Sequence, residues 1–312
     1  MSGQATVTGP QGMPVQRKRA RFSVWDRIMA LSDVGIATWA VITYIFLYLP
    51  VVVLVLFSFT SDQFNLKFTH PTLEWYRSQP QASTKVIGVI HDPTIIKAFE
   101  TSIEIAIFST IIAVIIGTLG SFALERFEFR TKNLWDGLNY TKIIIAEVVA
   151  GVSSLLFFVQ LDKFLYDYLY FNFGGLFKPG FADVLIAHVA WNIPFIVVII
   201  RARLKGFDRA IEEAGADLGA RPTTVFFRIT LPVIFPGILA AALLSFTLSF
   251  DDFVTTYFTA GPTTVTLPLK IWSMVRMGIT PEINAISTFM MALSMTIVVV
   301  LELKARISEQ IA

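Results

Sequence analysis

Six apolar runs, separated by polar segments, dominate the chain after residue 35. A helix needs about 20 apolar residues to cross a hydrocarbon core of about 30 Å, and each run reaches or approaches that length. The pattern therefore predicts an all-α integral membrane protein with six transmembrane helices. The predicted spans are residues 36–59, 103–124, 143–159, 182–200, 233–250 and 283–301.

The chain begins with a polar stretch, residues 1–16, and becomes basic at Arg17, Lys18, Arg19 and Arg21. A cleavable signal peptide is the alternative explanation of the apolar run that follows, but the apolar region of such peptides is shorter than this run. We therefore predict that the first span is retained. The predicted parts of the chain are a cytosolic arm and interfacial segment at 1–35, a membrane domain at 36–303 and a cytosolic tail at 304–312.

Polar or helix-breaking residues interrupt two of the predicted spans. Glu147 and Gly151 lie in the third, and the fourth contains Trp191, Asn192 and Pro194. A transmembrane proline leaves one backbone carbonyl without its helical donor, so such a helix usually faces protein or water there. We predict a broken fourth helix. We also expect Glu147 to face the bundle interior, because exposure to lipid at mid-bilayer costs about 2.5–3.5 kcal/mol.

Basic residues fall mainly on one side of the predicted spans. Seventeen of the 25 Lys and Arg residues lie in the N-terminal arm, the second and fourth loops and the C-terminal tail, and eight lie on the other side. Cytoplasmic loops of membrane proteins carry the excess of Lys and Arg. This distribution predicts that both termini and the fourth loop are cytoplasmic.

Composition narrows the possible chemistry. The chain is 54% hydrophobic and 15% charged, with a mean hydropathy of +0.66 and a net charge of only +2, which disfavours a nucleic-acid binder. It has no cysteine, so disulfides, thiolate metal sites and cysteine nucleophiles are excluded. Its three histidines, His70, His91 and His188, are far apart in the sequence. We predict no metal site and no catalytic residue.

The loop at residues 204–232 predicts a helix–turn–helix hairpin on the cytoplasmic side. Gly219 can take the left-handed conformation that ends a helix, and Pro222 suits the first turn of a second one. Three carboxylates in six residues suit an anionic lipid surface poorly, which favours a protein partner. The apolar residues of the first helix recur at helical spacing and are Phe207, Ile211, Ala214 and Leu218.

This loop resembles the signature of the permease subunits of binding-protein-dependent ABC importers. The signature reads E-A-A, three residues, G, nine residues, then I-x-L-P. The matching positions are Glu213, Ala214, Gly219, Ile229, Leu231 and Pro232, with Gly215 in place of the second alanine. Glycine loosens a helix by up to about 1 kcal/mol relative to alanine. The resemblance covers the chain from about residue 26 onward and implies the type I ABC importer permease fold.

The resemblance implies that these seven residues couple the permease to a partner ATPase. It also implies a sibling permease subunit, two ATPase subunits and a periplasmic or extracellular substrate-binding protein, in a bacterial inner membrane. The chain contains no G-x-x-x-x-G-K-S/T phosphate loop. ATP and its Mg²⁺ are therefore expected on the ATPase, with no cofactor in this chain.

Other segments resemble the second permease subunit of spermidine/putrescine importers. They include TLEWY at residues 72–76, AEVVAGVSSLLFF at 146–158, IPFIVVIIRARL at 193–204 and the stretch 248–285. That branch more often has proline where this chain has Ala146. Ferric iron, thiamine or another organic cation are the alternative cargoes, because their permeases share the coupling loop.

A polyamine pathway needs carboxylates to replace hydration and aromatic faces to hold methylenes and ammonium groups. The candidates are Glu147, Trp191, Asp251, Asp252 and Tyr257. Each also has a purely structural interpretation: helix packing for Glu147 and Trp191, a solvated helix end for the two aspartates, and the interfacial aromatic belt for Tyr257.

Two other classes of protein provide contrasting hypotheses. An intramembrane enzyme would use Glu147, Asp251, Asp252 or His188, yet no nucleophile–base pair or metal-ligand spacing joins these residues. A stand-alone channel or secondary carrier would have no need of an acidic hairpin with a fixed continuation to I-x-L-P. An importer subunit without chemistry of its own is the interpretation that accounts for the hairpin.

Overall fold

The computed structural model describes residues 24–62, 70–77, 88–169, 178–278 and 280–311. Most of the predicted N-terminal arm lies outside these residues. The chain divides into two units, residues 1–54 and 55–312. In the first unit, α1 (Val24–Phe57) contains Pro50 and carries the apolar span Gly35–Phe57. None of that span is buried, as expected of a helix whose neighbours are lipid or other chains.

The second unit is helical throughout its described part, apart from one isolated bridge between Thr60 and Pro71. A π-helical turn, Phe226–Thr230, joins α8 to α9. The helices are α2 (Glu74–Arg77), α3 (Pro93–Arg126), α4 (Lys132–Ile144), α5 (Glu147–Leu169), α6 (Phe181–Lys205), α7 (Arg209–Asp217), α8 (Pro222–Val225), α9 (Leu231–Phe250), α10 (Val254–Thr259), α11 (Leu267–Met277) and α12 (Pro281–Ile311).

The described residues contain six helices long and apolar enough to cross a membrane, which confirms the prediction of six spans. The predicted start of the third span is wrong. Ile143 and Ile144 complete α4. Residues 145–146 are not helical, and the span begins at Glu147. Apolar residues continue across this break, so hydropathy alone does not reveal it. The six spans are Gly35–Phe57, Pro93–Arg126, Glu147–Asp167, Phe181–Lys205, Pro222–Phe250 and Pro281–Val300.

The predicted break in the fourth span is also wrong. The helix α6 continues without interruption through Trp191 and Pro194. Proline removes one hydrogen-bond donor, here the donor for the carbonyl of Ala190, and a helix packed on several others can tolerate that loss. Asn192 is buried, with 1% of its surface exposed. The fourth span is therefore a complete helix with a polar residue inside the bundle.

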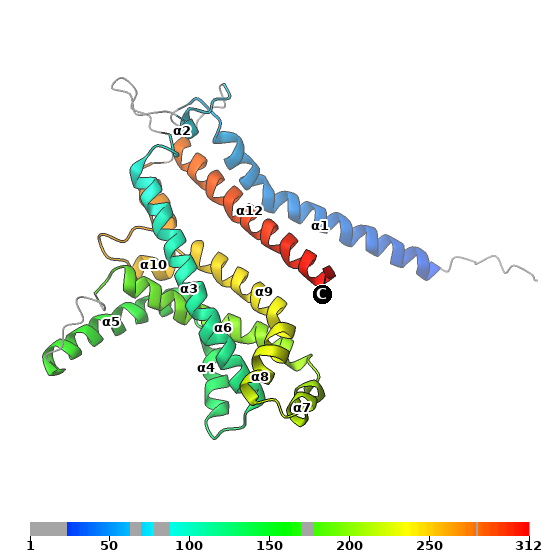
Figure 1. Ribbon diagram of the computed structural model, residues 1–312. Helices are drawn as coiled ribbons and strands as arrows, with labels where there is room; N and C mark the ends of the chain where they lie inside the picture. The colour runs from blue at the N-terminus through cyan, green and yellow to red at the C-terminus, as the bar shows by residue number, and fades with distance from the viewer. Residues whose placement is uncertain (1–23, 63–69, 78–87, 170–177, 279, 312) are drawn as a thin grey trace, which may run out of the picture. The chain divides into compact units, whose positions relative to one another are not determined.

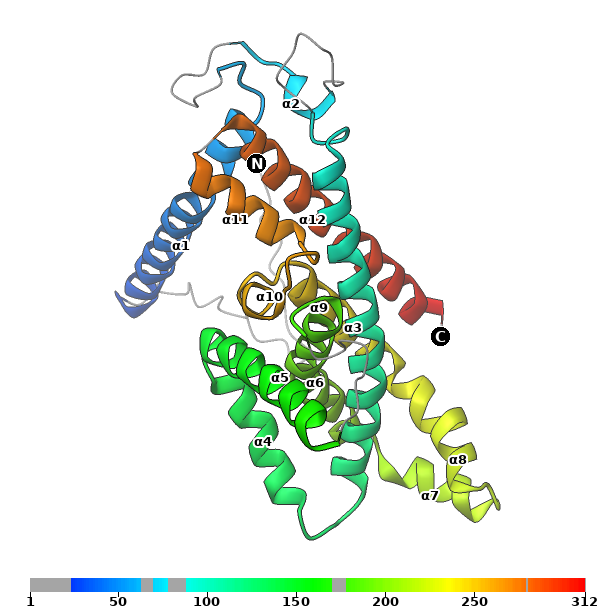
Figure 2. The same cartoon turned by 90° about the vertical axis from the view of Figure 1, so that its left-hand side faces the viewer.

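Three helices, α3, α6 and α9, pack against one another and form the centre of the second unit. Figures 1 and 2 show α3 running alongside α6 and α9. Small residues permit this close approach, as is common between membrane helices. A Cβ atom added to Gly117 of α3 would lie 2.6 Å from Cγ2 of Ile196, and one added to Gly237 of α9 would lie 2.6 Å from Cγ of Arg203.

An ion-paired arginine holds three helices together at one end of the bundle. Arg201 of α6 donates from Nε to Glu125 of α3 at 3.1 Å and from a terminal nitrogen to Asp136 of α4. All three side chains are at least three-quarters buried. Hydrogen bonds to charged groups are among the stronger ones in proteins, particularly in partly buried positions. This cluster therefore fixes α4 against α3 and α6.

At the opposite end of the bundle, an apolar cluster is accompanied by two hydrogen bonds. The Trp75 indole donates to the carbonyl of Thr60 at 2.7 Å, and the backbone N–H of Leu267 donates to Oγ of Ser102 at 2.7 Å. Ser102 thereby anchors the start of α11 to α3. The buried members of the cluster are Trp75, Val89, Ile95, Leu267, Ala285 and Ile286.

We expect Gly117→Val to lower the free energy of unfolding by about 1–3 kcal/mol, because the new side chain enters space held by Ile196. Thermal unfolding of the purified protein in detergent measures the loss. Gly120→Val is the matched control, since an added Cβ there meets nothing within 4 Å in the same helix. Equal losses in the two variants would contradict close packing at Gly117.

Candidate coupling hairpin and cargo site

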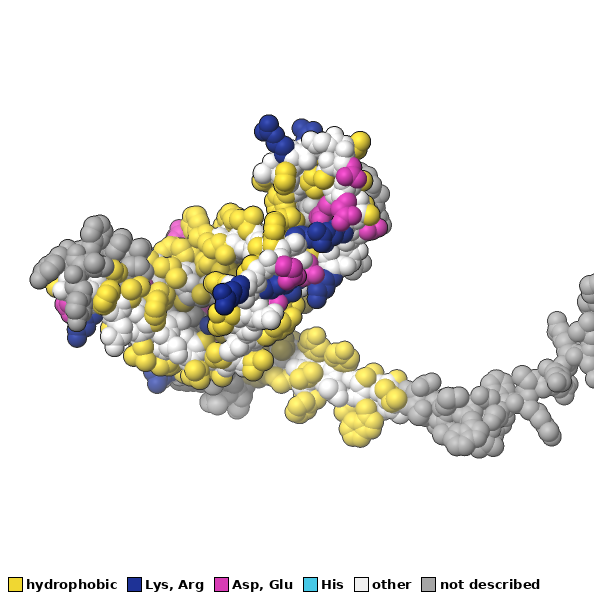
Figure 3. All heavy atoms as spheres, turned by 90° about the horizontal axis from the view of Figure 1, so that it is seen from below, with side chains coloured by type: hydrophobic (Ala, Val, Ile, Leu, Met, Phe, Trp, Pro, Cys, Tyr) yellow, Lys and Arg dark blue, Asp and Glu magenta, His cyan; other side chains and the backbone are white. Residues whose placement is uncertain are grey.

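The loop after the fourth span forms the predicted hairpin of two short helices. Asp208 caps α7 by accepting from the backbone N–H of Ala210 at 3.0 Å. Gly219 follows α7 with a φ of +81°, and Pro222 opens α8. Both turn predictions are therefore confirmed. Figure 3 shows acidic and basic side chains gathered on the lobe that α7 and α8 form.

Two positions of the signature contact each other inside the hairpin. Gly215 is buried, and a Cβ added to it would lie 2.6 Å from Cδ1 of Ile229. Because Cδ1 is the end of a flexible side chain, a small displacement of Ile229 would accommodate alanine at position 215. The spacing between Gly215 and Ile229 thus reflects packing of α7 against the π-helical turn.

Glu212 anchors the hairpin to the membrane helices, a role that the sequence analysis missed. Its carboxylate pairs with Nε of Arg126 at 3.0 Å and accepts from Oγ1 of Thr230 at 2.7 Å. Only 12% of each side chain in the ion pair is exposed. One glutamate therefore links α7 to the end of α3 and to the start of the fifth span. The signature spacing includes the neighbouring Glu213 and does not include Glu212.

The other face of α7 is uncovered. Leu218 is 89% exposed and Ile211 50% exposed. Glu213 also points outward, with 67% of its side chain exposed and only Arg209 near it at 3.4 Å. The amphipathic helix therefore turns Glu212 and Gly215 toward the protein and its apolar stripe away from it. Such an arrangement leaves an apolar surface rimmed by charge available to a partner.

A buried carboxylate organises the C-terminal end of the fifth span. Asp252 is 8% exposed and accepts hydrogen bonds at the start of α10. Its donors are the backbone N–H groups of Thr255, at 3.3 Å, and Thr256, at 2.8 Å, together with the Thr256 hydroxyl at 2.9 Å. Asp251 and Asp252 are both predicted pathway candidates, with a solvated helix end as the structural alternative. The two differ in the structure, because Asp251 is exposed whereas Asp252 is enclosed.

His188, buried in α6, ties this carboxylate to the helix core. Its Nε2 lies 3.0 Å from Asp252 Oδ2, and its Nδ1 lies 2.7 Å from Oγ of Ser249. Ser249 in turn lies 2.9 Å from Oγ of Ser109 on α3. Burial by itself raises the pKa of Asp252, but hydrogen bonds from His188 and Thr256 hold the pKa below its usual range.

Glu147 completes the cluster from the first turn of α5. Its carboxyl group is close enough to the carboxylate of Asp252 for the two groups to interact. Gly151, one turn later, permits this approach, since a Cβ there would lie 2.8 Å from Cδ2 of Phe258 on the helix after Asp252. Carboxyl groups in contact cannot both be ionised without a large cost, so a cation or a shared proton is needed between them. Glu147, His188 and Asp252 are far apart in the sequence, so no local pattern predicts that they come together.

Aromatic residues flank this acid–histidine cluster. Tyr257 is 47% exposed, and its ring lies 5.6 Å from that of Phe253, which lies 5.2 Å from the ring of Trp272. Trp191, half-buried on α6, has the ammonium of Lys142 4.9 Å from its ring centre. Electron-rich ring faces attract ammonium groups and contact methylenes. The cluster and its surroundings thus supply both kinds of group that a flexible polycation requires.

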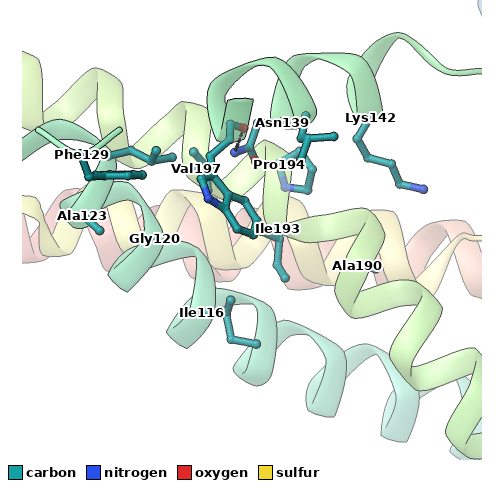
Figure 4. Close-up of a pocket in the computed structure, with 13 residues that line it drawn as sticks. Ile116, Gly120, Ala123, Phe129, Asn139, Lys142, Ala190, Ile193, Pro194 and Val197 are labelled. Carbon is teal, nitrogen blue, oxygen red and sulfur yellow. Dashed lines mark hydrogen bonds between the residues drawn. The ribbon is translucent and has the colours of Figure 1, made fainter. Parts of the chain in front are cut away.

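A mainly apolar cavity of about 480 Å³ lies between α3, α4 and α6. Figure 4 shows the residues around it, with Lys142 and Asn139 contributed by α4 and Pro194 by α6. Within the described part of the chain, no group of three or more His, Cys, Asp or Glu residues could hold a metal ion.

We expect Asp252→Asn to lower the free energy of unfolding by about 2–4 kcal/mol, because His188 and α10 lose a charged acceptor. Asp251→Asn is the control and should change it by less than about 0.5 kcal/mol, as for other exposed residues. Thermal unfolding at a series of pH values checks both. Since the folded-state pKa of Asp252 is lowered, its contribution is present above the unfolded value of about 3.9 and is lost in more acid solution.

The difference between Asp252→Asn and the unaltered protein should therefore persist down to about pH 4 and shrink below it. A difference that disappears between about pH 8 and pH 5 would contradict a lowered pKa at this carboxylate.

Residues 116–310 match the family described as "Binding-protein-dependent transport system inner membrane component". The spermidine/putrescine transport system permease protein PotC of Escherichia coli (strain K12) is 35% identical over 263 residues, covering 84% of this chain and 90% of that protein. PotC of Haemophilus influenzae is 35% identical over 265 residues, covering 85% and 94%. The putrescine permease PotI of Escherichia coli (strain K12) is 36% identical over 249 residues, covering 80% and 82%.

Solved structures of importers share the fold. A chain of the bacterial ABC transporter that imports alginate superposes with a TM-score of 0.68 at 15% identity, covering 91% of this chain and 98% of that one. A chain of the MetNI methionine transporter gives 0.54 at 13% identity, covering 69% and 97%. With six apolar helices and this similarity, the chain belongs to the inner membrane components of binding-protein-dependent transport systems, as a multi-pass permease subunit and not an enzyme.

Proposed function

We propose that this chain forms half of the cargo pathway of an ATP-driven importer of polyamines such as spermidine and putrescine. The similarity to permeases named for these cargoes, at 35–36% identity over most of both chains, is the observation that carries the proposal. The chemistry of the cluster agrees with it. Glu147 and Asp252 contact each other, which favours a cation beside them.

The remaining candidates extend this pathway along the bundle. Asp251 provides an exposed carboxylate beside the buried one, and Tyr257 an exposed ring. Trp191 provides a ring face on α6. Carboxylates can replace the hydration of ammonium groups, and aromatic rings can hold the methylenes between them. Five side chains of these two kinds lie at one end of the fifth span or in the helices packed beside it.

A permease of this family works with an ATPase and a substrate-binding protein. We propose in addition a sibling permease subunit, two ATPase subunits that bind ATP and Mg²⁺, and a cytoplasmic location for both termini and the hairpin. The exposed stripe of α7 supports a protein partner on this side, since Leu218 and Ile211 have no cover within the described chain. The membrane domain is assigned to residues 36–303 and the coupling loop to 204–232.

In this proposal the hairpin transmits movement of the ATPase through two contacts. Glu213, Ala214 and Gly219 belong to the docking surface, whereas Gly215, Ile229, Leu231 and Pro232 connect α7 to the fifth span. That span continues as one helix from Leu231 to Phe250, about 30 Å at 1.5 Å per residue. It ends next to Asp251 and Asp252. A displacement of the hairpin would therefore be delivered directly to the acidic cluster.

The two neighbouring glutamates of α7 should give different defects. Glu213→Arg places a cation where the docking surface has a carboxylate, so we expect the amount of ATPase that copurifies to fall about tenfold. Glu212→Gln removes the ion pair with Arg126 but leaves the outer face intact. It should retain the ATPase and lose transport. Copurification and uptake assays on membrane-inserted variants check this, and equal loss of ATPase from both would contradict the division of roles.

Uptake of labelled spermidine and putrescine tests the cargo assignment. Cells that lack this gene and other polyamine importers should lose uptake, and the unaltered gene should restore it. Asp252→Gln should restore it poorly at equal membrane levels, because the pathway loses its buried charge. Full uptake without the gene would overturn the polyamine assignment and leave the permease assignment in place.

A further inference from the structure

A lysine of this chain occupies an aromatic face beside the candidate pathway. The ammonium nitrogen of Lys142, in the last turn of α4, lies 4.9 Å from the centre of the Trp191 ring. Both residues are half-buried. The distance is within the range in which an ammonium group is attracted to the ring of tryptophan, the best of the aromatic partners.

The Trp191 ring is the partner of the Lys142 ammonium. Among the described residues, no carboxylate lies within ion-pair distance of Lys142, whereas Lys132 in the same helix pairs with Glu128 at 2.7 Å. Burial lowers the pKa of Lys142. A cation–π contact is worth about 0.5–2 kcal/mol, so another ammonium group can compete with Lys142 for the ring.

Both residues of this contact are near members of the acid–histidine cluster in the chain. Trp191 follows His188 by three residues on α6, and residues at that spacing are neighbours on a helix surface. Lys142 precedes Glu147 by five residues across the break between α4 and α5. A cation bound over Trp191 would therefore lie one helical turn from His188, whose Nε2 pairs with Asp252 at 3.0 Å.

The side chain of lysine is a butyl chain that ends in an ammonium group. Putrescine is a butyl chain with an ammonium at each end, and spermidine contains the same aminobutyl group. We propose that Lys142 is a specificity-determining residue whose aminobutyl side chain occupies, over the Trp191 ring, the position that an aminobutyl end of the cargo takes during transport. The inference rests on the proposed polyamine function.

The cavity between α3, α4 and α6 gives the displaced lysine a place to go. Lys142 lies at the edge of this cavity, and Figure 4 shows its ammonium directed away from Asn139 and Pro194. Asn139 and Ala190 both line the cavity. Because Pro194 has no N–H, the carbonyl of Ala190 lacks its usual helical donor and can accept from an ammonium group. Cargo binding over the ring and withdrawal of Lys142 are thus sterically and electrostatically compatible.

Lys142→Met tests the inference in cells that carry the complete importer, because methionine keeps a long flexible side chain without the charge. The variant removes the Lys142 ammonium, which competes with the cargo for the Trp191 ring. Because this contact is worth one moderate cation–π interaction, the putrescine concentration for half-maximal uptake should fall about fivefold. Lys142→Gln should act in the same direction. Lys132→Met, in the same helix but away from the ring, is the control and should leave this concentration unchanged.

The decisive comparison repeats Lys142→Met in a Trp191→Leu background. If the lysine acts by occupying the ring, its removal should change the half-maximal concentration less than about twofold when the ring is absent. The inference is overturned if both Lys142 variants reach the membrane and leave the concentration unaltered, or if the fivefold gain persists without Trp191. Failure of the unaltered gene to restore uptake would instead overturn the polyamine function, and this inference with it.

Discussion

Burial of the Asp252 carboxylate is the constraint around which the half of the bundle opposite the hairpin is arranged. A charge at 8% exposure next to a membrane span must have partners within the protein. The backbone of α10 supplies two donors, Thr256 a third and His188 a fourth. Because these donors come from α10 and α6, the chain turns after α9 and α10 packs against α5 and α6. The same packing places Glu147 of α5 beside the carboxylate.

The same requirement applies at the end of the bundle that carries the hairpin, where it ties α7 to the membrane helices. Arg126 ends α3 and needs an anion, which Glu212 provides. Thr230, fully buried at the start of the fifth span, bonds to that same carboxylate. Movement of α7 therefore strains contacts to α3 and α9 together. Since α3 and α9 also meet at Ser109 and Ser249, the two ends of the bundle are mechanically joined.

The sequence predicts the periodic features well, because a helix in lipid must hide its backbone and therefore repeats a simple pattern. The six spans and the hairpin turn at Gly219 follow from hydropathy and turn chemistry. The end of α4 does not, since the apolar run at residues 143–146 continues from the end of α4 through the break. Nor do the roles of His188 and Glu212, because their partners lie at least 18 residues away in the chain and no local pattern records such contacts.

A fixed cation beside a pathway for cations is at first sight unfavourable, yet it can improve selection. A small monovalent cation could compete for the Trp191 face but would gain nothing more there than Lys142 already does. A polyamine has a second ammonium on the same chain, and in this proposal the second ammonium pairs with the carboxyl groups of Glu147 and Asp252 while the first displaces the lysine. Linking two weak contacts in one molecule raises affinity beyond either alone, provided that the spacing fits. Discrimination then depends on the length of the chain between charges, a property that the butyl side chain of Lys142 itself matches.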